Sequence, residues 1–335
     1  MADIAILGSG GFGLALGVML NDYGHKVTVW TKFQEEIDII RKDGEYKLKL
    51  PGIKISENIH LTTDASELSG KDMLLVGLPT AFVRGVCDSV KGSVDKNTII
   101  VNTSKGLEPK TFKRMSEVLE EVFPENDIVV LTGPSHAEEV AKPYSATTIV
   151  AASKSEESVK IVQRELSNPR CRIYTNDDII GSEIGGALKN VIALCAGIVD
   201  GMGLGDNTKA ALMTRGIQEI ARLGVSLGGR VETFAGLTGI GDLIVTCTSM
   251  HSRNRRAGIL IGQGVNPEEA VKQVGTVEGY SCCAVAWELC KAQGVSMPIT
   301  EQLYLVLFEN KDVHEAMKDL MGRPTRDETE KGWLS

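Results

Sequence analysis

The sequence has few of the residues that build metal centres and basic surfaces. Its five histidines include no HExxH pair and its seven cysteines include no CxxC pair, so metal ligation has little support. Lys and Arg number 36 against 44 Asp and Glu, which leaves a net charge of −8. A general nucleic-acid binder needs a basic field. We therefore expect no metal and no nucleic acid among the partners of this protein.

Long apolar runs are also missing. No stretch approaches the about 20 apolar residues of a membrane span, and the N-terminal MADIAILGSGGFG lacks the basic and apolar regions of a secretory signal. The odd number of cysteines and the adjacent Cys282 and Cys283 argue against a disulfide framework. These absences predict a cytoplasmic protein without a membrane span, whose cysteines are reduced packing residues.

The composition is typical of an ordinary globular protein, with 42% hydrophobic residues, 24% charged residues and 36 glycines. A chain of 335 residues is long for one core and comfortable for two. As far as about residue 175, short β-rich runs alternate with helical patterns, which predicts an α/β domain with a parallel sheet. The expected strands are 3–7, 26–30, 58–63, 72–78, 97–104, 127–133, 146–153 and 171–176.

Beyond residue 180 the strand pattern fades and helical patterns take over. The expected helices are 182–200, 207–227, 252–263, 267–274, 281–293, 297–309 and 312–321. We therefore predict an α/β N-terminal domain of the Rossmann type, residues 1–180, followed by an all-α C-terminal domain, residues 181–335.

A glycine-rich loop follows the first expected strand directly. Gly8, Gly10 and Gly13 form a GxGxxG pattern between a strand and a helix, the context that a dinucleotide-binding fingerprint requires. Backbone N–H groups at such a helix start can receive a pyrophosphate. The alternative is a glycine-rich turn without a ligand. The predicted cofactor-binding run is Gly8, Ser9, Gly10, Gly11, Phe12 and Gly13.

The end of the second expected strand carries no acid. An NAD site usually has Asp or Glu there, about 20 residues past the glycines, to bind the ribose hydroxyls. This chain has Trp30, Thr31 and Lys32 instead. Because Lys32 can pair with a 2′-phosphate, we expect NADP(H) to be accepted, while its preference over NAD(H) stays open. The alternative for Lys32 is a solvated surface lysine.

Charged and polar residues also follow two later strands. In open α/β sheets, ligands bind beyond the carboxyl ends of the strands. Lys105 follows the expected strand 97–104, and Gly133 and Ser135 follow the expected strand 127–133. Taken alone, each is equally well explained as an ordinary loop residue. Together they point to one ligand site.

The helical half contains LTGIGDLIVTCTSMHSRNRRAG, in which Asp242 belongs to a second glycine-rich loop and a basic cluster follows. Ser252 is a suitable N-cap, which would place Arg253 and Asn254 at a helix start, where N–H groups and a guanidinium can hold a phosphate. The alternative is a solvated basic turn. We expect the next two arginines, 255 and 256, to be structural or solvated.

Lys189 lies in GSEIGGALKNVIALCAGIVDGM, a helical stretch that is apolar or small nearly all round. Its neighbours on the helix are Gly185, Gly186, Ile192 and Ala193, and none of them is a carboxylate. Small neighbours allow a close approach, and a dry apolar wall lowers the pKa of a lysine. Such a lysine can exchange a proton with an alcohol or a carbonyl. The alternative is a lysine whose charged end reaches solvent.

These residues resemble the bacterial NAD(P)-dependent glycerol-3-phosphate dehydrogenases along essentially the whole chain. The blocks that carry the resemblance, in the order of the family, are GSGGFG, NTSKGLE, GPSHAEE, EIGGALKNVIALCAGIVDG, TRGIQEIARLG, TFAGLTGIGDLIVTC, SRNRRAG and TVEGY. The resemblance implies a dinucleotide-binding Rossmann domain, residues 1–180, and a helical substrate-binding and catalytic domain, residues 181–335. It implies NAD(P)-dependent hydride transfer between dihydroxyacetone phosphate and sn-glycerol 3-phosphate, for glycerophospholipid synthesis.

The resemblance also implies a role for each matching residue. Lys189 would transfer the proton, Lys105 would contact both cofactor and substrate, and Asp242 would contact the substrate and steady the lysines. The implied substrate-binding residues are Lys105, Gly133, Ser135, Lys189, Asn190, Asp242, Ser252, Arg253 and Asn254. The implied cofactor contacts outside the glycine loop are Lys32, Lys105, Ala137, Arg253, Val277 and Glu278.

Two other functions stay open at this point. One is a two-domain dehydrogenase of the same plan that acts on a hydroxyacyl thioester, a ketopantoate-like acid or a phosphogluconate. The other is a dinucleotide sensor without catalysis. The paired lysines and the SRN cluster favour a small phosphate ester, and the joint presence of Lys105, Lys189 and Asp242 argues against a sensor. The sequence leaves the oligomeric state open, a homodimer included.

Overall fold

The computed structural model describes residues 1–325 and 327–328. The chain divides into two compact units. Unit 1 comprises Met1–Ser104 and Met115–Ile179, and unit 2 comprises Lys105–Arg114 and the chain from Ile180 onward. The short segment Lys105–Arg114 therefore leaves unit 1 and returns to it.

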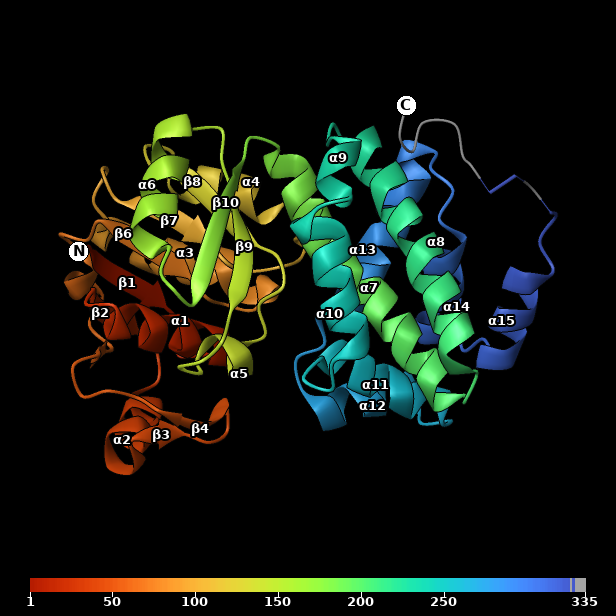
Figure 1. The fold of residues 1–335 in the computed structure, drawn as a ribbon, viewed down its shortest axis with the longest axis horizontal. Coiled ribbons are helices and arrows are strands. Elements are labelled where there is room, and N and C mark those ends of the chain that lie inside the picture. Colours follow the sequence, from red (N-terminus) through yellow and green to blue (C-terminus); the bar gives the residue numbers. More distant parts are fainter. Residues whose placement is uncertain (326, 329–335) are drawn as a thin grey trace. The chain divides into compact units, whose positions relative to one another are not determined.

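Unit 1 is built on an eight-stranded sheet with the strand order β10-β9-β8-β7-β6-β1-β2-β5 (Figure 1). The strands are β1 (Asp3–Leu7), β2 (Lys26–Trp30), β5 (His60–Thr62), β6 (Met73–Val76), β7 (Ile99–Asn102), β8 (Ile128–Thr132), β9 (Thr147–Ala152) and β10 (Cys171–Asn176). Each lies within one of the predicted strand segments, so the alternation of strands and helices is confirmed. A separate antiparallel hairpin of β3 (Glu45–Tyr46) and β4 (Leu50–Lys54) was not predicted.

The helices of unit 1 cover both faces of this sheet. They are α1 (Gly11–Asp22), α2 (Gln34–Asp43), α3 (Val83–Val90), α4 (Met115–Val122), α5 (Ala137–Val140) and α6 (Glu156–Leu166). Successive residues of a strand point to opposite faces, so Ile4 and Ile6 pack in one apolar cluster with α1 and α6, whereas Ala5 and Leu7 pack in another with α3 and α4. Both faces of β1 are therefore buried.

The position of β1 within the sheet sets the place for a ligand. β1 lies between β2 and β6, so the chain first extends the sheet to one side and later returns to the other. Ligands of open α/β sheets bind beyond the carboxyl ends of the strands at such a topological switch point. The glycine loop at 8–13 begins at this point.

The sheet is not parallel throughout. β9 is antiparallel to β8, and β10 is parallel to β9, so the last two strands run against the other six. Parallel neighbours normally need a crossover connection that contains a substantial helix. The connection from β8 to β9 holds only the four-residue α5, and the chain turns back instead. The predicted parallel sheet is thus correct for six strands and wrong for β9 and β10.

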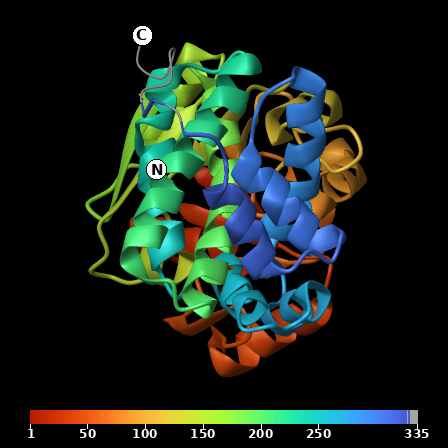
Figure 2. The ribbon, with the colours of Figure 1, turned by 90° about the vertical axis from the view of Figure 1, so that its right-hand side faces the viewer.

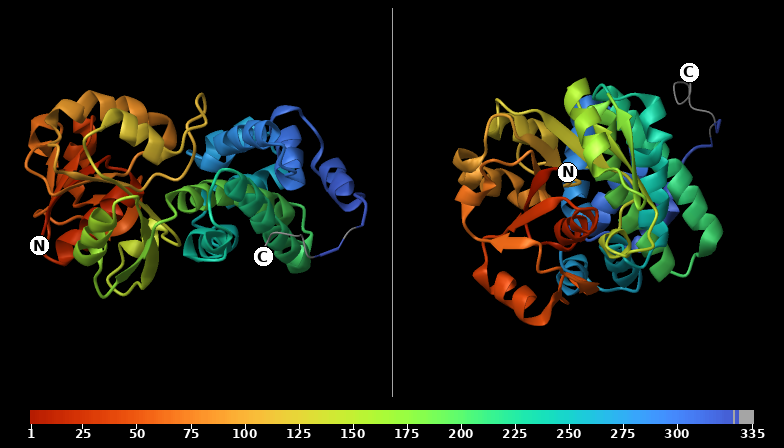
Figure 3. Two further views of the ribbon diagram at one scale, coloured as in Figure 1. Left: turned by 90° about the horizontal axis from the view of Figure 1, so that it is seen from above. Right: turned by 60° about the vertical axis from the view of Figure 1, so that its left-hand side comes forward.

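Unit 2 is helical, as predicted, and Figure 2 shows its helices coloured from green to blue. In the left view of Figure 3 the blue α13 and α14 lie in a different layer from the green α7 and α8. The helices are α7 (Ile179–Gly201), α8 (Gly205–Ser226), α9 (Val231–Phe234), α10 (Asp242–Thr248), α11 (Arg253–Gly262), α12 (Pro267–Val274), α13 (Glu278–Gln293), α14 (Pro298–Phe308) and α15 (Val313–Met321).

The stretch between α8 and α11 is not the glycine-rich loop that the sequence suggested. It forms α9, then a π-helical turn at Leu237–Gly241, then α10. A Cβ on Gly239 would lie 2.0 Å from the carbonyl oxygen of Phe234, so glycine is what allows this turn to pack on α9. Single π turns often occur at functional sites. Asp242 consequently stands at the start of a helix.

Glycines allow α7 to pack backbone against backbone. A Cβ on Gly197 would lie 2.1 Å from the carbonyl oxygen of Arg255 in α11, and a Cβ on Gly185 would lie 2.7 Å from that of Thr238 in the π-helical turn. Neither distance is tolerable for a real side chain. The small residues of α7 are therefore required by the helices that cross it.

By length and composition α7 could cross a membrane, although the sequence holds no continuous apolar run of that length. In the structure, 89% of its most apolar window is buried inside the protein. Its residues Leu188, Val191 and Leu194 belong to the main apolar cluster of unit 2. Burial to this extent is typical of a core helix in a globular protein.

The crossing of α7 and α11 predicts that Gly197→Ala destabilises the protein. The added methyl group would meet a main-chain carbonyl that no rotamer change can move aside, so we expect a loss of about 3 kcal/mol in the free energy of unfolding. Gly85→Ala is the matched control, because Gly85 lies in α3 with no atom within 4 Å of its Cβ position. That change should stabilise by about 0.5–1 kcal/mol. Urea titrations of both variants test this, and equal effects would contradict the close crossing.

Candidate active site

Asp242 lies between the two lysines that the sequence singles out. Its Oδ1 accepts a hydrogen bond from Lys189 Nζ at 2.5 Å, and its Oδ2 accepts one from Lys105 Nζ at 2.8 Å. The side chains are 1% exposed for Asp242, 7% for Lys189 and 18% for Lys105. The carboxylate missing from the helical neighbours of Lys189 is thus supplied by another helix, α10. The alternative, a lysine whose charged end reaches solvent, is wrong, because the side chain of Lys189 is 7% exposed.

Burial and charge act in opposite directions on the pKa values of this group. Burial lowers the pKa of Lys189 to about 8, the charge of Asp242 opposes that shift, and the charge of Lys105 adds to it. Burial alone would raise the pKa of Asp242, but the two lysine charges and their hydrogen bonds bring it below its ordinary value. At neutral pH, Asp242 is therefore ionised and Lys189 is a protonated amine that loses its proton readily.

Thr246 is a further member of the group that the sequence analysis missed. Its Oγ1 accepts a hydrogen bond from Lys189 Nζ at 2.7 Å and donates one to the main-chain oxygen of Asp242 at 2.6 Å. Thr246 follows Asp242 by four residues, which places both on one face of α10. The sequence contains this spacing, but a spacing of four residues places two side chains on one face only in a helix, and the sequence suggested a loop here.

The segment Lys105–Arg114 is held within unit 2 at several points. Leu107 is 3% exposed and belongs to the main apolar cluster of that unit. Arg114 Nη1 donates to Glu183 Oε2 of α7 at 2.7 Å, and both side chains are almost completely buried. A buried ion pair is costly to break. These contacts fix the segment that carries Lys105 against α7, the helix that carries Lys189.

The SRN cluster forms a helix start, as predicted. Ser252 Oγ caps α11 by accepting from the N–H of Arg255, and its carbonyl oxygen accepts from the N–H of Arg256. The N–H groups of Arg253 and Asn254 then remain available to an anion. Arg255 is structural, as expected, since its Nε donates to Asp200 at 2.7 Å.

Asn190 and Asn254 are buried and bonded to each other. Asn254 Nδ2 donates to Asn190 Oδ1 at 2.9 Å, and Asn254 Oδ1 accepts from the N–H of Gly279 at 2.8 Å. These bonds connect α7, α11 and the start of α13, where Val277 is the N-cap residue and Glu278 the first helical residue. The side chain of Asn254 is thus largely committed to holding three helices together.

Three glycines of the loop in unit 1 have no room for a Cβ atom. Gly8 has φ +101°, and its Cβ would lie 3.1 Å from the carbonyl oxygen of Gly77 at the end of β6. A Cβ on Gly13 would lie 2.5 Å from the carbonyl oxygen of Gly8, and one on Gly11 the same distance from that of Lys49. Such a bare backbone at the start of α1 fits a pyrophosphate, which helix N–H groups can receive.

Three other predicted residues of unit 1 lie just after β8 or near this loop. Gly133 follows β8 with φ +118°, and Ser135 Oγ donates to its carbonyl oxygen at 2.9 Å. Ala137 opens α5, and its Cβ lies 3.9 Å from the Cβ position of Gly11. Phe12 and Ala137 both pack against the apolar cluster that includes α1. The glycine-loop residues belong to unit 1, and the lysine–aspartate group belongs to unit 2.

At the end of β2 the structure shows an acid that the sequence pattern did not reveal. Lys32 is exposed there, as a solvated lysine would be. Glu36, from the first turn of α2, accepts hydrogen bonds from Ser9 Oγ of the glycine loop and from Thr31 Oγ1. The helix brings this carboxylate back to the end of the strand. The residues at the strand end give no sign of it, because Glu36 lies six residues further along the sequence.

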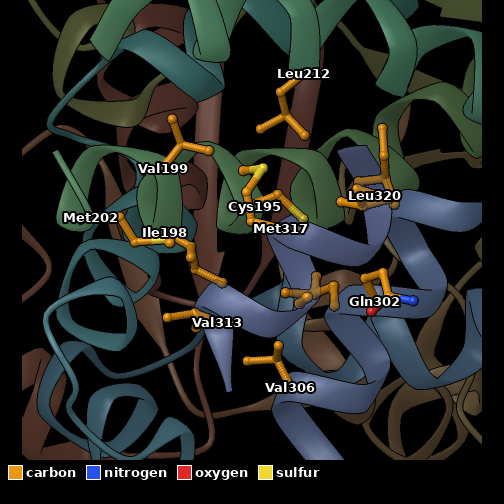
Figure 4. A pocket seen from close by; sticks show the side chains of 13 residues that line it. Cys195, Ile198, Val199, Met202, Leu212, Gln302, Val306, Val313, Met317 and Leu320 are labelled. Atoms are coloured by element: carbon orange, nitrogen blue, oxygen red, sulfur yellow. The ribbon is translucent and has the colours of Figure 1, made fainter. Parts of the chain in front are cut away.

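The apolar cavity in unit 2 is not a second candidate for the chemistry. It measures about 50 Å³ and lies among α7, α8, α14 and α15 (Figure 4). Its lining is apolar except for Gln302, whose Oε1 accepts from Lys311. This lining offers few polar groups to a phosphate or to a reacting oxygen. Among residues 1–325, 327 and 328, no cluster of three metal-ligating side chains occurs.

Comparisons with known proteins identify the family that this chain resembles along its length. The model of the NAD-dependent glycerol-3-phosphate dehydrogenase N-terminus matches residues 3–159, and that of the C-terminus matches residues 178–318. The chain is 49% identical over 333 residues to "Glycerol-3-phosphate dehydrogenase [NAD(P)+]" of Clostridium perfringens (strain SM101 / Type A), covering 98% of this chain and 99% of that protein. It is 50% identical over 332 residues to the protein of that name from Moorella thermoacetica, covering 98% of each.

A solved structure shows the same arrangement of elements. The crystal structure of glycerol-3-phosphate dehydrogenase from Coxiella burnetii superposes with a TM-score of 0.92 at 35% identity. The match covers 96% of this chain and 99% of that one. The α/β N-terminal and helical C-terminal architecture expected from the sequence is therefore confirmed.

The buried ion pairs predict that Asp242→Asn destabilises unit 2. Removing one partner from a buried charge group leaves its ammonium groups uncompensated, which costs about 3–5 kcal/mol. Asp319→Asn is the matched control, because Asp319 pairs with Lys311 but is 57% exposed. Exposed pairs contribute about 0–1 kcal/mol. The denaturant midpoints of the parent and the two variants test this prediction. Equal shifts of the midpoint in the two variants would contradict the argument from burial.

Proposed function

This chain belongs to the NAD-dependent glycerol-3-phosphate dehydrogenase family, and from that premise we propose that Lys189 transfers the proton of the reaction. The activity is that of an NAD(P)-dependent oxidoreductase acting on glycerol 3-phosphate. Dihydroxyacetone phosphate and glycerol 3-phosphate differ by one hydride and one proton. A bound nicotinamide supplies the hydride, which leaves the proton and the positioning to the protein.

Lys189 donates its proton to the carbonyl oxygen during reduction and takes it back during oxidation. Three observations support this role: its burial, its hydrogen bonds to Asp242 and Thr246, and the lowering of its pKa to about 8. A catalytic acid–base group works best when its pKa lies near the working pH. The hydrogen bond to the carboxylate of Asp242 is the single observation that carries the proposal.

Lys105 and Asp242 complete the charge arrangement. The oxygen of the substrate becomes alkoxide-like in the transition state, and two fixed ammonium groups stabilise that developing charge. Asp242 bonds to both amines and so offsets their mutual repulsion. Asp242 keeps Lys105 and Lys189 close together without a substrate, so little reorganisation accompanies the reaction.

The substrate phosphate is held at the start of α11 in this proposal. The N–H groups of Arg253 and Asn254 and the guanidinium of Arg253 provide donors for it, and Ser252 fixes the helix start. Asn190 lies beside this helix start through its bond to Asn254. Further substrate contacts are proposed for Gly133 and Ser135, by analogy with the family.

Unit 1 binds the pyrophosphate of the cofactor in this proposal. The loop from Gly8 to Gly13 has the bare backbone that a pyrophosphate needs. The further contacts proposed from the resemblance are Lys32, Lys105, Ala137, Arg253, Val277 and Glu278. Residues 1–180 then form the dinucleotide-binding domain, and residues 181–335 form the substrate-binding and catalytic domain. The proposal includes the family role of supplying glycerol 3-phosphate for phospholipid synthesis in the cytoplasm.

The role of Lys189 predicts that Lys189→Ala lowers kcat for dihydroxyacetone phosphate reduction by at least about 10²-fold. Cofactor binding should be unchanged, because Lys189 is not among the proposed cofactor contacts. The absorbance of reduced nicotinamide follows the reaction, and cofactor titration follows binding. Lys272→Ala, an exposed lysine on α12, is the control and should keep full activity. A loss of less than tenfold in the Lys189 variant would remove Lys189 from this role.

The pKa of Lys189 predicts opposite pH profiles for the two directions. Reduction needs the protonated amine, so kcat/KM for dihydroxyacetone phosphate should fall as the pH rises through about 8. Oxidation of glycerol 3-phosphate needs the neutral amine, so kcat/KM should rise up to about 8 and then level off. The substrate phosphate, with a second pKa of about 6, stays ionised over this range. Parallel profiles in both directions would contradict the assignment.

A further inference from the structure

We propose that Glu36 sets the cofactor preference of this chain by binding the adenosine ribose hydroxyls and disfavouring a 2′-phosphate, so that NADH is bound in preference to NADPH. This inference rests on the proposed role of the glycine loop in cofactor binding. The sequence suggested that Lys32 pairs with the 2′-phosphate of NADP(H), whereas in this proposal Glu36 disfavours that phosphate.

The carboxylate of Glu36 is fixed by three hydroxyl groups. Its Oε2 accepts from Ser9 Oγ in the glycine loop and from Thr31 Oγ1 at 2.8 Å, and its Oε1 accepts from Tyr46 Oη at 3.1 Å. Ser9 and Thr31 are each 4% exposed. Burial and the charge of Glu36 raise the pKa of Tyr46 to about 12, so its hydroxyl remains a donor. The carboxylate therefore has one defined position beside the glycine loop.

That position is where a ribose acceptor belongs in this fold. Dinucleotide sites usually place Asp or Glu at the carboxyl end of the second strand, next to the glycine loop, to accept from the ribose hydroxyls. Here the strand ends at Trp30, and Thr31 bonds to a carboxylate that arrives from α2. Glu36 thus occupies the usual place of the acid although it lies six residues past the strand.

The carboxylate also has the capacity to bind a further donor. An ionised carboxylate offers about four lone-pair sites, and three are used by Ser9, Thr31 and Tyr46. Serine and threonine hydroxyls can rotate to other acceptors when a ligand arrives. A ribose hydroxyl can therefore be accepted without displacing the side chain of Glu36.

A 2′-phosphate would meet a negative charge at the same place. Phosphate monoesters carry about −1.5 to −2 charges at neutral pH, and like charges at close range cost more where solvent is partly excluded. Lys32 could offset this repulsion, but it is exposed and has no hydrogen-bond or ion-pair partner in the described part of the chain. Glu36 is held in place and Lys32 is not, so the charge of Glu36 dominates the discrimination.

Calorimetric titration of the full chain with NADH and with NADPH, without substrate, tests the proposal. We expect NADH to bind at least about tenfold more tightly, as the gain or loss of one charged hydrogen bond implies. In Glu36→Gln, which keeps the size and one acceptor oxygen, that ratio should shrink by about tenfold or more, mainly because NADPH binds more tightly. Glu35→Gln, an exposed neighbour in the same helical turn, should leave the ratio unchanged.

A second test uses two smaller ligands and only the parent chain, so it does not require the variant to fold. Adenosine 5′-monophosphate and adenosine 2′,5′-bisphosphate differ only in the 2′-phosphate, and the parent chain should bind the monophosphate more tightly. Tighter binding of NADPH or of the bisphosphate by the parent would overturn the proposal. An equal loss of affinity for both dinucleotides in Glu36→Gln would also overturn it, because that result means a purely structural role. None of these outcomes depends on Lys189, so they are separable from a failure of the catalytic assignment.

Discussion

The charge group of Lys105, Lys189 and Asp242 is the constraint on which unit 2 depends. Its three side chains come from separate stretches of the sequence, and Lys189 and Asp242 are almost completely buried, whereas Lys105 is partly buried. Buried charges are tolerated only when they are paired and hydrogen-bonded. Gly185 of α7 packs against the main chain of the π-helical turn that leads directly into α10, the helix that carries Asp242.

The anion sites proposed for the two units differ in the groups that they use. In the proposed cofactor site, unit 1 offers main-chain groups, which are accessible because Gly8, Gly11 and Gly13 have no Cβ. In the proposed substrate site, unit 2 combines helix N–H groups at the start of α11 with side-chain cations, and its two buried lysines are paired with a carboxylate of the protein itself. Glu36 adds a selective element to the first solution, since a carboxylate beside the loop accepts hydroxyl groups and repels phosphate.

Much of this organisation follows from local sequence patterns. The eight strands, the glycine loop and the capping by Ser252 each depend on neighbouring residues, and each was predictable. Contacts between distant residues were not. The bond from Lys189 to Asp242 spans 53 positions, and the approach of Glu36 to Ser9 depends on how α2 packs. The reversal of β9 and the π-helical turn before Asp242 also follow from packing, which no local spacing encodes.

Because the segment Lys105–Arg114 interrupts unit 1 in the sequence and belongs to unit 2, neither unit can be exchanged as one continuous stretch of chain. The polypeptide passes between them at 104/105, at 114/115 and at 179/180, so no single cut separates one unit from the other. A chimaera joined at residue 180 would take Lys189 and Asp242 from one parent and Lys105 from the other. Recombination between relatives at that joint therefore mixes the members of one buried charge group, and the two halves can be exchanged only together with this ten-residue strap.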